Sequence, residues 1–470
     1  MSGSWPTSGV DLHLELDPAT GRRAGLEQAL RAAIQTGRLA PQARLPATRR
    51  LAADLGLSRG TVKAAYDQLT AEGYLTARQG SGTVVARLPQ STAGAPDRGP
   101  GRPSVQPRYD LRPGRPDVSA FPTAAWLRSA RRALGSAAAD AYSYGDPRGR
   151  IELRTALAEY LGRTRGVVAP PELIVITNGY VQALALLGRV LGETASIATE
   201  DPGVAFHRDV IRRQGPAVVA LPVDHRGART DLLGAPGFPH VDAVELTPAH
   251  QYPTGGTLGP ERRRVLVDWA RSNGRLVIEN DYDGEFRYDR QPIGAIQGTA
   301  PDHVAYVGTA SKTLGPALRL GWIVPPRHLL EPLVEAKRHI DHHTESIGQL
   351  TLADFIARHA YDRHVRACRL RYKRRRDLLL ARLRSRPGLS VHGVAAGLHV
   401  LVSLPADGPA EQDVVDAAAA QDVAVGRLGD RWHTPGDHPQ GIIVGFGTPN
   451  EHVYPAALDA LTRALDACSA

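Results

Sequence analysis

The chain has 470 residues, of which 42% are hydrophobic and 22% are charged, and its formal net charge is +9. This length holds roughly two to four domains, and the composition excludes a fully disordered or fibrous protein. No apolar run reaches the roughly 18 residues of a membrane span, and the N-terminus lacks a secretory pattern, so a cytoplasmic protein without a membrane partner is expected. We interpret the widely spaced Cys368 and Cys468 as structural thiols.

The positive charge is concentrated near the N-terminus. Residues 1–110 carry 14 Lys and Arg against 9 Asp and Glu, whereas the other 360 residues carry 43 against 39. This asymmetry favours a polyanionic partner, with a basic solvated surface as the alternative. Only four of the 57 basic residues are lysines, namely Lys63, Lys312, Lys337 and Lys373.

A stretch rich in Pro, Gly and Arg divides the chain. Residues 87–109 lack apolar periodicity and are interpreted as a linker. The sequence therefore predicts an N-terminal domain at 11–86 and a C-terminal domain at 110–470. In the latter, apolar β-rich runs alternate with helical patterns, which predicts an α/β fold.

The N-terminal domain has the pattern of a winged helix-turn-helix. Apolar spacing predicts helices over 25–37, 48–56 and 58–73, with Thr48 and Ser58 as the N-caps of the second and third. A three- or four-residue connection between these two helices is typical of a helix-turn-helix, and two short strands after them predict a hairpin wing, giving an α+β domain.

The third helix would present its N-terminal residues to the major groove. Ser58, Arg59 and Thr61 offer hydroxyls and a guanidinium suited to phosphates or guanine edges. A protein-docking domain is the alternative that helical periodicity alone leaves open.

The string GRLAPQARLPATRRLAADLGLSRGTVKAAYDQLTAEGYLTARQGSGTVV resembles the winged helix-turn-helix domain of GntR-family bacterial repressors. The resemblance covers residues 11–86 and implies double-stranded operator DNA as the partner. Lys63 is a further candidate for a phosphate contact. The residues that the resemblance implies as DNA contacts are Arg49, Ser58, Arg59, Thr61 and Gly80.

Three segments of the C-terminal domain are candidates for a site. The strand–turn–helix LIVITNGYVQALALLGRV offers free N–H groups to a phosphate, or is an ordinary βα turn. TPAHQYPTGG follows a strand and brings His250 and Tyr252, although a buried structural histidine is an alternative. RLVIENDYDGEFRY follows another strand with four carboxylates that could form a solvated acidic loop or bind a metal; they are Glu279, Asp281, Asp283 and Glu285.

The fourth segment, HVAYVGTASKTLGPALRLGW, places Lys312 just after a strand and Arg319 seven residues later. Lysine can lose its proton and form an imine, which arginine cannot, so a Schiff-base lysine is favoured over a surface charge. Thr309, Ser311 and Arg319 would suit a phosphate beside it.

Together these segments resemble the fold-type I aminotransferases that bind pyridoxal 5′-phosphate (PLP), over residues 109–470. YDLRPGRPDVSAFPTAAWLRSARRAL, AYSYGDPRGRIELRTALAEYLGRTRGV, TPAHQYPTG and GTASKTLGPALRLG resemble one subgroup, the MocR/PdxR-type regulators. The resemblance implies a multidomain homodimer whose C-terminal α/β domain has a mainly parallel sheet. It also implies Lys312 as the Schiff-base lysine, Tyr144 reaching the partner subunit's cofactor, and contacts from Gly179, Tyr180, Val181, Tyr252, Asn280, Tyr282, Thr309 and Arg319.

Three positions depart from the aminotransferase pattern. Asn280 stands where the carboxylate that pairs with the pyridine nitrogen is usual, and Asp281 could replace it only after a local shift. Val204 replaces the usual aromatic, leaving Phe206 as a possible stacking residue. Ile443 replaces the arginine that holds the substrate carboxylate. Because a weakened pyridine counterion weakens the electron sink, transaminase activity should be weak at most.

We therefore expect a PLP-binding transcriptional regulator in which PLP, or an amine or amino acid that reacts with it, controls operator binding. The missing carboxylate arginine favours PLP itself, and vitamin B6 or amino-acid metabolism is the expected target. The rival is an active PLP-dependent aminotransferase that carries a DNA-binding domain. A pure interaction module is a third alternative.

Overall fold

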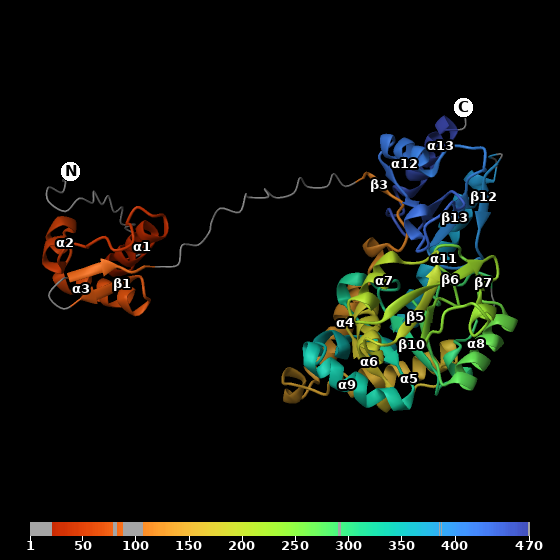
Figure 1. Ribbon diagram of the computed structural model, residues 1–470, viewed down its shortest axis with the longest axis horizontal. Coiled ribbons are helices and arrows are strands. Elements are labelled where there is room, and N and C mark those ends of the chain that lie inside the picture. Colours follow the sequence, from red (N-terminus) through yellow and green to blue (C-terminus); the bar gives the residue numbers. More distant parts are fainter. Residues whose placement is uncertain are drawn as a thin grey trace. The chain divides into compact units, whose positions relative to one another are not determined.

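The computed structural model describes residues 21–78, 82–87, 107–289, 293–384, 386 and 388–468. The chain divides into two compact units, Met1–Ser104 and Val105–Ala470, which are drawn in Figure 1. Most of the predicted linker lies outside the described residues.

The N-terminal unit consists of three helices and a hairpin. Its core is formed by side chains on one face of each helix, with Leu30, Leu51, Val62 and Leu69 fully buried. The helices are α1 (Arg22–Gln35), α2 (Thr48–Leu55) and α3 (Arg59–Ala71), and the antiparallel strands are β1 (Leu75–Arg78) and β2 (Gly82–Val85). The predicted winged helix-turn-helix is therefore confirmed.

Short-range contacts and backbone conformation explain where the helices of this unit begin and end, but one predicted cap is wrong. The Ser58 hydroxyl caps α3 by accepting a hydrogen bond from the Thr61 N–H at 3.1 Å. Gly56 ends α2 in the left-handed conformation, φ 63°. The prediction that Thr48 caps α2 is wrong, because Ala47 has the extended backbone of the cap and Thr48 already lies in the helix. The wing tip with Gly80 lies outside the described residues.

Ser58→Ala should destabilise the N-terminal unit by about 1 kcal/mol, because the first turn of α3 loses its side-chain acceptor. Calorimetry of the full chain measures this as a lower transition temperature of that unit. Ser58→Asp, which keeps a capping acceptor, should retain most of the stability; equal losses in both variants would contradict the capping role.

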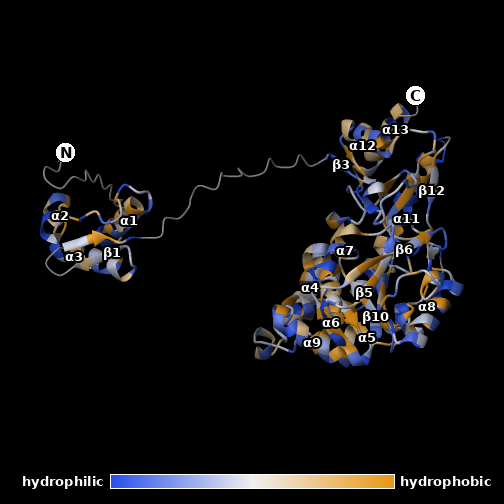
Figure 2. Cartoon of the chain, viewed as in Figure 1, coloured by the Kyte–Doolittle hydropathy of each residue, from blue (hydrophilic) through white to orange (hydrophobic). Residues whose placement is uncertain are grey.

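The large unit is built on an eight-stranded sheet that is mainly parallel, as predicted. β11 and β7 run antiparallel to the strands beside them, and the other strands share one direction. The apolar strands lie between amphipathic helices (Figure 2). In spatial order the strands are β4 (Val175–Thr177), β11 (Gly321–Val324), β10 (Val304–Thr309), β9 (Leu276–Asp281), β8 (Ala243–Leu246), β5 (Ser196–Asp201), β6 (Ala217–Asp224) and β7 (Gly227–Ala228).

Alternate residues of each strand face opposite layers. In β10, Ala305 and Val307 pack on one face, whereas Val304 and Tyr306 pack on the other. The first face is covered by α6 (Tyr180–Leu191), α7 (Ala205–Arg212) and α9 (Arg327–Asp341). The second is covered by α5 (Ile151–Arg165), α8 (Pro260–Asn273) and α10 (Ser346–Ala357).

A smaller antiparallel sheet forms the C-terminal part of this unit around its own core. Its strands are β12 (Ser390–His392), β13 (His399–Ser403), β16 (Gly441–Gly445) and β15 (Gly426–Arg427). The short strand β3 (Tyr109–Asp110) pairs with β14 (Val423–Ala424). The remaining helices are α4 (Thr123–Gly135), α11 (Ala360–Leu383), α12 (Glu411–Ala420) and α13 (Tyr454–Cys468). None of the described helices combines the length and apolarity needed to cross a membrane.

Candidate cofactor pocket and DNA-binding surface

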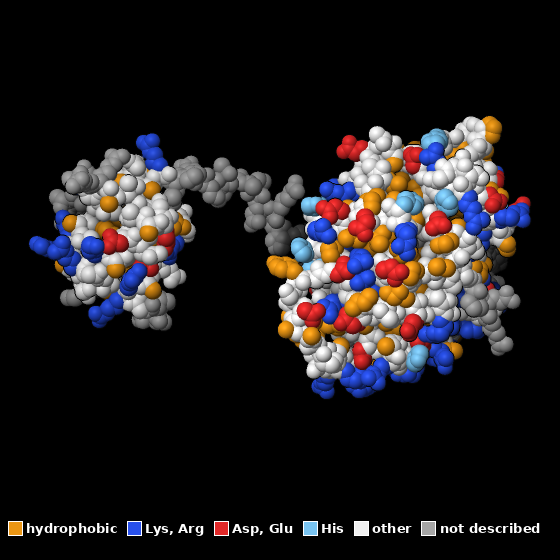
Figure 3. Space-filling model, turned by 90° about the horizontal axis from the view of Figure 1, so that it is seen from below, with side chains coloured by type: hydrophobic (Ala, Val, Ile, Leu, Met, Phe, Trp, Pro, Cys, Tyr) orange, Lys and Arg blue, Asp and Glu red, His pale blue; other side chains and the backbone are white. Residues whose placement is uncertain are grey.

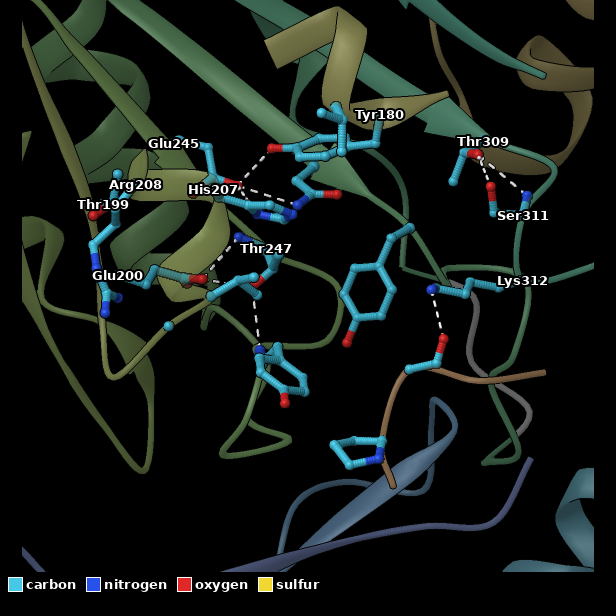
Figure 4. A pocket seen from close by; sticks show the side chains of 18 of the residues that line it. Tyr180, Thr199, Glu200, His207, Arg208, Glu245, Thr247, Thr309, Ser311 and Lys312 are labelled. Carbon is cyan, nitrogen blue, oxygen red and sulfur yellow. Dashed lines mark hydrogen bonds and ion pairs between the residues drawn. The ribbon is translucent and has the colours of Figure 1, made fainter. Parts of the chain in front are cut away.

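A pocket of about 340 Å³ lies where four parallel strands end. Residues at or just beyond the carboxyl ends of β5, β8, β9 and β10 line it, together with the first turns of α6 and α7. Ligands of open α/β sheets bind at this edge. Figure 4 shows Tyr180, His207 and Glu245 gathered on one side of the pocket and Lys312 with Thr309 and Ser311 on another.

The Lys312 amine lies in this pocket, as the sequence suggested. Its Nζ donates a hydrogen bond to the Gly114 carbonyl oxygen at 2.7 Å. Burial lowers the pKa of Lys312, opposed by the negative charge of Asp283. A larger fraction of the amine is therefore neutral than at an exposed lysine, and the neutral form is the one that attacks a carbonyl.

Arg319 lies against the N-terminus of α6. Its guanidinium donates to the Asn178 carbonyl. A Cβ at Gly179, where φ is +84°, would lie only 3.2 Å from that guanidinium, so glycine is needed at this close approach. Thr309 and Ser311 bring two hydroxyls 2.8 Å apart nearby. Free helix N–H groups, a guanidinium and hydroxyls together form a cradle suited to a phosphate.

Glu245 is a pocket residue that sequence reasoning missed. Its Oε1 accepts hydrogen bonds from the Tyr180 hydroxyl at 2.6 Å and from Asn280 Nδ2 at 3.1 Å, and His207 Nδ1 lies 3.8 Å away. Glu245 lies in VDAVEL, which the sequence marks only as the strand before TPAHQYPTGG. The signal that could have found Glu245 is strand periodicity, which puts it on the same face as Ala243.

Asp281 lies on the opposite face of the sheet from the pocket. Its carboxylate pairs with Arg165, with Nε and Oδ2 2.7 Å apart, and accepts from the Tyr306 hydroxyl at 2.7 Å. A shift of one residue reverses the face to which a strand side chain points. Asn280 lines the pocket and Asp281 does not.

Two tyrosines form the wall beside Lys312, and a histidine lies behind them. Tyr252 and Tyr282 line the pocket, and burial raises the pKa of both. The Tyr282 hydroxyl lies 3.2 Å from His250 Nδ1, which in turn lies 2.8 Å from Asp283 Oδ2. His250 is thus buried behind this wall, as expected if it is a structural histidine.

The four carboxylates of residues 279–285 are directed to different partners. Glu279 accepts from the backbone N–H groups of Ile296 and Gln297, whereas Asp283 faces His250. Among the described residues no group of three or more His, Cys, Asp or Glu is arranged to hold a metal ion.

Not all of the residues expected to stack on the cofactor ring, or to reach the cofactor from a partner subunit, lie in the pocket. Val204 and His207 line the pocket, but Phe206 does not, and its side chain is 59% exposed. Tyr144 lies outside this pocket, 83% exposed, with its ring centroid 5.0 Å from that of His342.

Two arginines lie in the pocket wall. Arg208, on α7, and Arg431 both line it. The Arg431 guanidinium lies 5.8 Å from the Tyr252 ring centre, and its Nε has no hydrogen-bond partner among the described residues. Ile443 is fully buried in β16, and Arg427 pairs with Asp430.

The expected DNA contacts lie at the start of the helix-turn-helix elements. Arg49, Ser58 and Arg59 are exposed and Thr61 is half-buried. Lys63 pairs with Asp67 at 2.7 Å. Figure 3 shows several basic side chains protruding from the surface of this unit.

Comparisons with known proteins match both units. The model of bacterial regulatory proteins of the gntR family matches residues 22–85, and that of aminotransferase class I and II matches residues 114–430. The pyridoxine biosynthesis transcriptional regulator PdxR of Corynebacterium glutamicum is 32% identical over 94% of this chain and 96% of its own. The probable rhizopine catabolism regulatory protein MocR of Rhizobium meliloti is 34% identical over 93% of this chain and 92% of its own.

Among solved structures, the kynurenine aminotransferase of Pyrococcus horikoshii superposes with a TM-score of 0.69, at 26% identity, over 76% of this chain and 90% of that one. An archaeal alanine:glyoxylate aminotransferase gives the same TM-score at 28% identity. The large unit thus has the aminotransferase fold, and both regulators align over nearly all of this chain. The chain therefore belongs to the MocR/PdxR-type transcriptional regulators of the GntR family.

Proposed function

We propose that the large unit binds PLP through Lys312 and that the bound cofactor controls the affinity of the N-terminal unit for operator DNA. The observation that carries this proposal is the placement of a half-buried lysine amine and a phosphate cradle in one pocket. When bound, PLP supplies an aldehyde carbon that reacts reversibly with amines.

The residues of the pocket fit the cofactor. Arg319, Thr309 and the first N–H groups of α6 at Gly179, Tyr180 and Val181 would hold the phosphate. Tyr252 and Tyr282 would flank the ring, and Asn280 would face its nitrogen. Tyr144, exposed on this subunit, would complete the partner subunit's pocket in a homodimer.

The placement of Arg208 and Arg431 in the pocket favours an amino acid as a second signal in addition to PLP. Arg431 has an unpartnered Nε, and Arg208, which donates to the carbonyl oxygens of Arg431 and Trp432, adds positive charge to the same wall, so the pair would suit a carboxylate. We propose that an amino acid, held there by its carboxylate, can present its amine to the cofactor at Lys312. The regulator of C. glutamicum, named for pyridoxine biosynthesis, favours PLP itself as a signal.

The cofactor site is tested by adding PLP to cofactor-free protein, reducing with borohydride and mapping the modified peptide. The proposal requires one pyridoxyl group per chain, on Lys312. Modification of the other lysines alone, or none, would refute it.

The DNA-binding half of the proposal predicts the effect of Arg59→Ala. If Arg59 reads a base edge, the variant should bind operator DNA more weakly by about 1–3 kcal/mol while its nonspecific binding changes little. Fluorescence anisotropy with specific and scrambled duplexes measures both. Arg23→Ala removes an exposed arginine that is paired with Glu27 on α1 and serves as the control. Equal affinities of the Arg59 and Arg23 variants would contradict this role.

A further inference from the structure

Glu245 and Asn280 form a buried pair on two neighbouring strands. β8 and β9 run parallel, and both side chains point to the sheet face that carries α6 and α7. Glu245 is 5% exposed and Asn280 is 3% exposed. Asn280 Nδ2 donates to Glu245 Oε1 at 3.1 Å, and both residues line the pocket.

This contact fixes which end of the Asn280 amide remains free. An ionised carboxylate only accepts hydrogen bonds, so it holds the amide NH₂ and leaves the carbonyl oxygen. That oxygen, Oδ1, is buried and has no hydrogen-bond partner among the described residues. A buried acceptor without a donor is costly, which indicates that a ligand supplies the donor.

The groups around Glu245 show that it is the carboxylate that holds the Asn280 amide. Tyr180 donates to it, and burial lowers the pKa of His207, which keeps that imidazole neutral. Burial above all, together with the charge of Glu245, raises the pKa of Glu200 to about 8, which favours its protonated form. Glu200 contacts Thr247 and Gln251 instead of Asn280.

We propose that Glu245 and Asn280 together replace the missing aspartate as the counterion of the cofactor's pyridine nitrogen. Glu245 is the positioning residue. It turns the Asn280 carbonyl oxygen toward the ring nitrogen, where only an N–H can pair with it, and its negative charge favours that protonated form. The proton comes from solvent, and no bond within the protein changes.

This inference rests on the proposed PLP site, and its test separates the two. The full-length protein is loaded with PLP labelled with nitrogen-15 in the ring, and the ring nitrogen's NMR shift is followed against pH. Glu245→Gln should lower the pH at which the nitrogen is half-protonated by about one unit or more, a tenfold change in proton affinity. Glu200→Gln, which removes the other buried carboxylate, should leave it unchanged.

The exchange variant Glu245→Gln/Asn280→Asp places a carboxylate directly at the ring and should restore protonation, which separates loss of charge from a damaged pocket. Unchanged protonation in Glu245→Gln overturns the inference while leaving the PLP site intact. Wild-type protein that binds no labelled PLP overturns the proposed function itself.

Discussion

The Lys312→Ala variant should bind operator DNA with one affinity at every PLP concentration, equal to that of the cofactor-free wild type. Coupled sites typically change affinity about 5- to 150-fold, and this change should disappear. The physical reason is that Lys312 Nζ is the amine in the pocket that would form a covalent bond with the aldehyde, whereas Arg319 and α6 would hold only the phosphate. Fluorescence anisotropy on full-length protein measures the effect.

Lys373→Ala is the matched control for this variant. Lys373 lies on α11, is exposed and pairs with Asp377 at 2.8 Å, so its loss removes a lysine without changing the pocket. This control should respond to PLP as the wild type does. A Lys312→Ala protein whose DNA affinity still changes with PLP would show that the signal does not pass through this lysine.

The Arg165→Met variant should lose about 3–5 kcal/mol of unfolding free energy. Arg165 and Asp281 are each less than 5% exposed, and the substitution leaves the Asp281 carboxylate buried without its counterion. Denaturant unfolding, followed by tryptophan fluorescence, reports mainly on the large unit, which contains four of the five tryptophans.

Arg163, two residues earlier on α5, provides the comparison. Its guanidinium is 53% exposed and pairs with Asp362 at 2.9 Å. Exposed pairs contribute at most about 1 kcal/mol, so Arg163→Met should be nearly neutral. If both variants lost the same stability, burial of the Arg165–Asp281 pair would not be the source of its larger contribution.

Local patterns predicted the elements more reliably than the site. Glycines, a capping serine and apolar spacing were sufficient for the helices of the N-terminal unit, because each is a contact within a few residues. Thr48 was misassigned by one residue because its sequence neighbours do not show where the extended backbone ends.

The pocket could be predicted only in part, because its remaining residues come together through the fold. Lys312 and Arg319 lie in one segment with a recognisable pattern. Glu245 is a polar residue in an apolar strand, and only the pairing of β8 with β9 brings it to Asn280. Arg431 reaches the pocket from a segment more than 100 residues after Lys312. The spacing of residues in the sequence does not show that two such distant segments meet.

The most direct test of the account is the affinity of cofactor-free protein for DNA upstream of its own gene as PLP is titrated in, with Lys312 occupancy followed in parallel. The account predicts that DNA affinity changes together with occupancy and reaches a plateau when Lys312 is saturated. DNA affinity that stays constant while Lys312 fills with PLP, both with and without added amino acids, would contradict it.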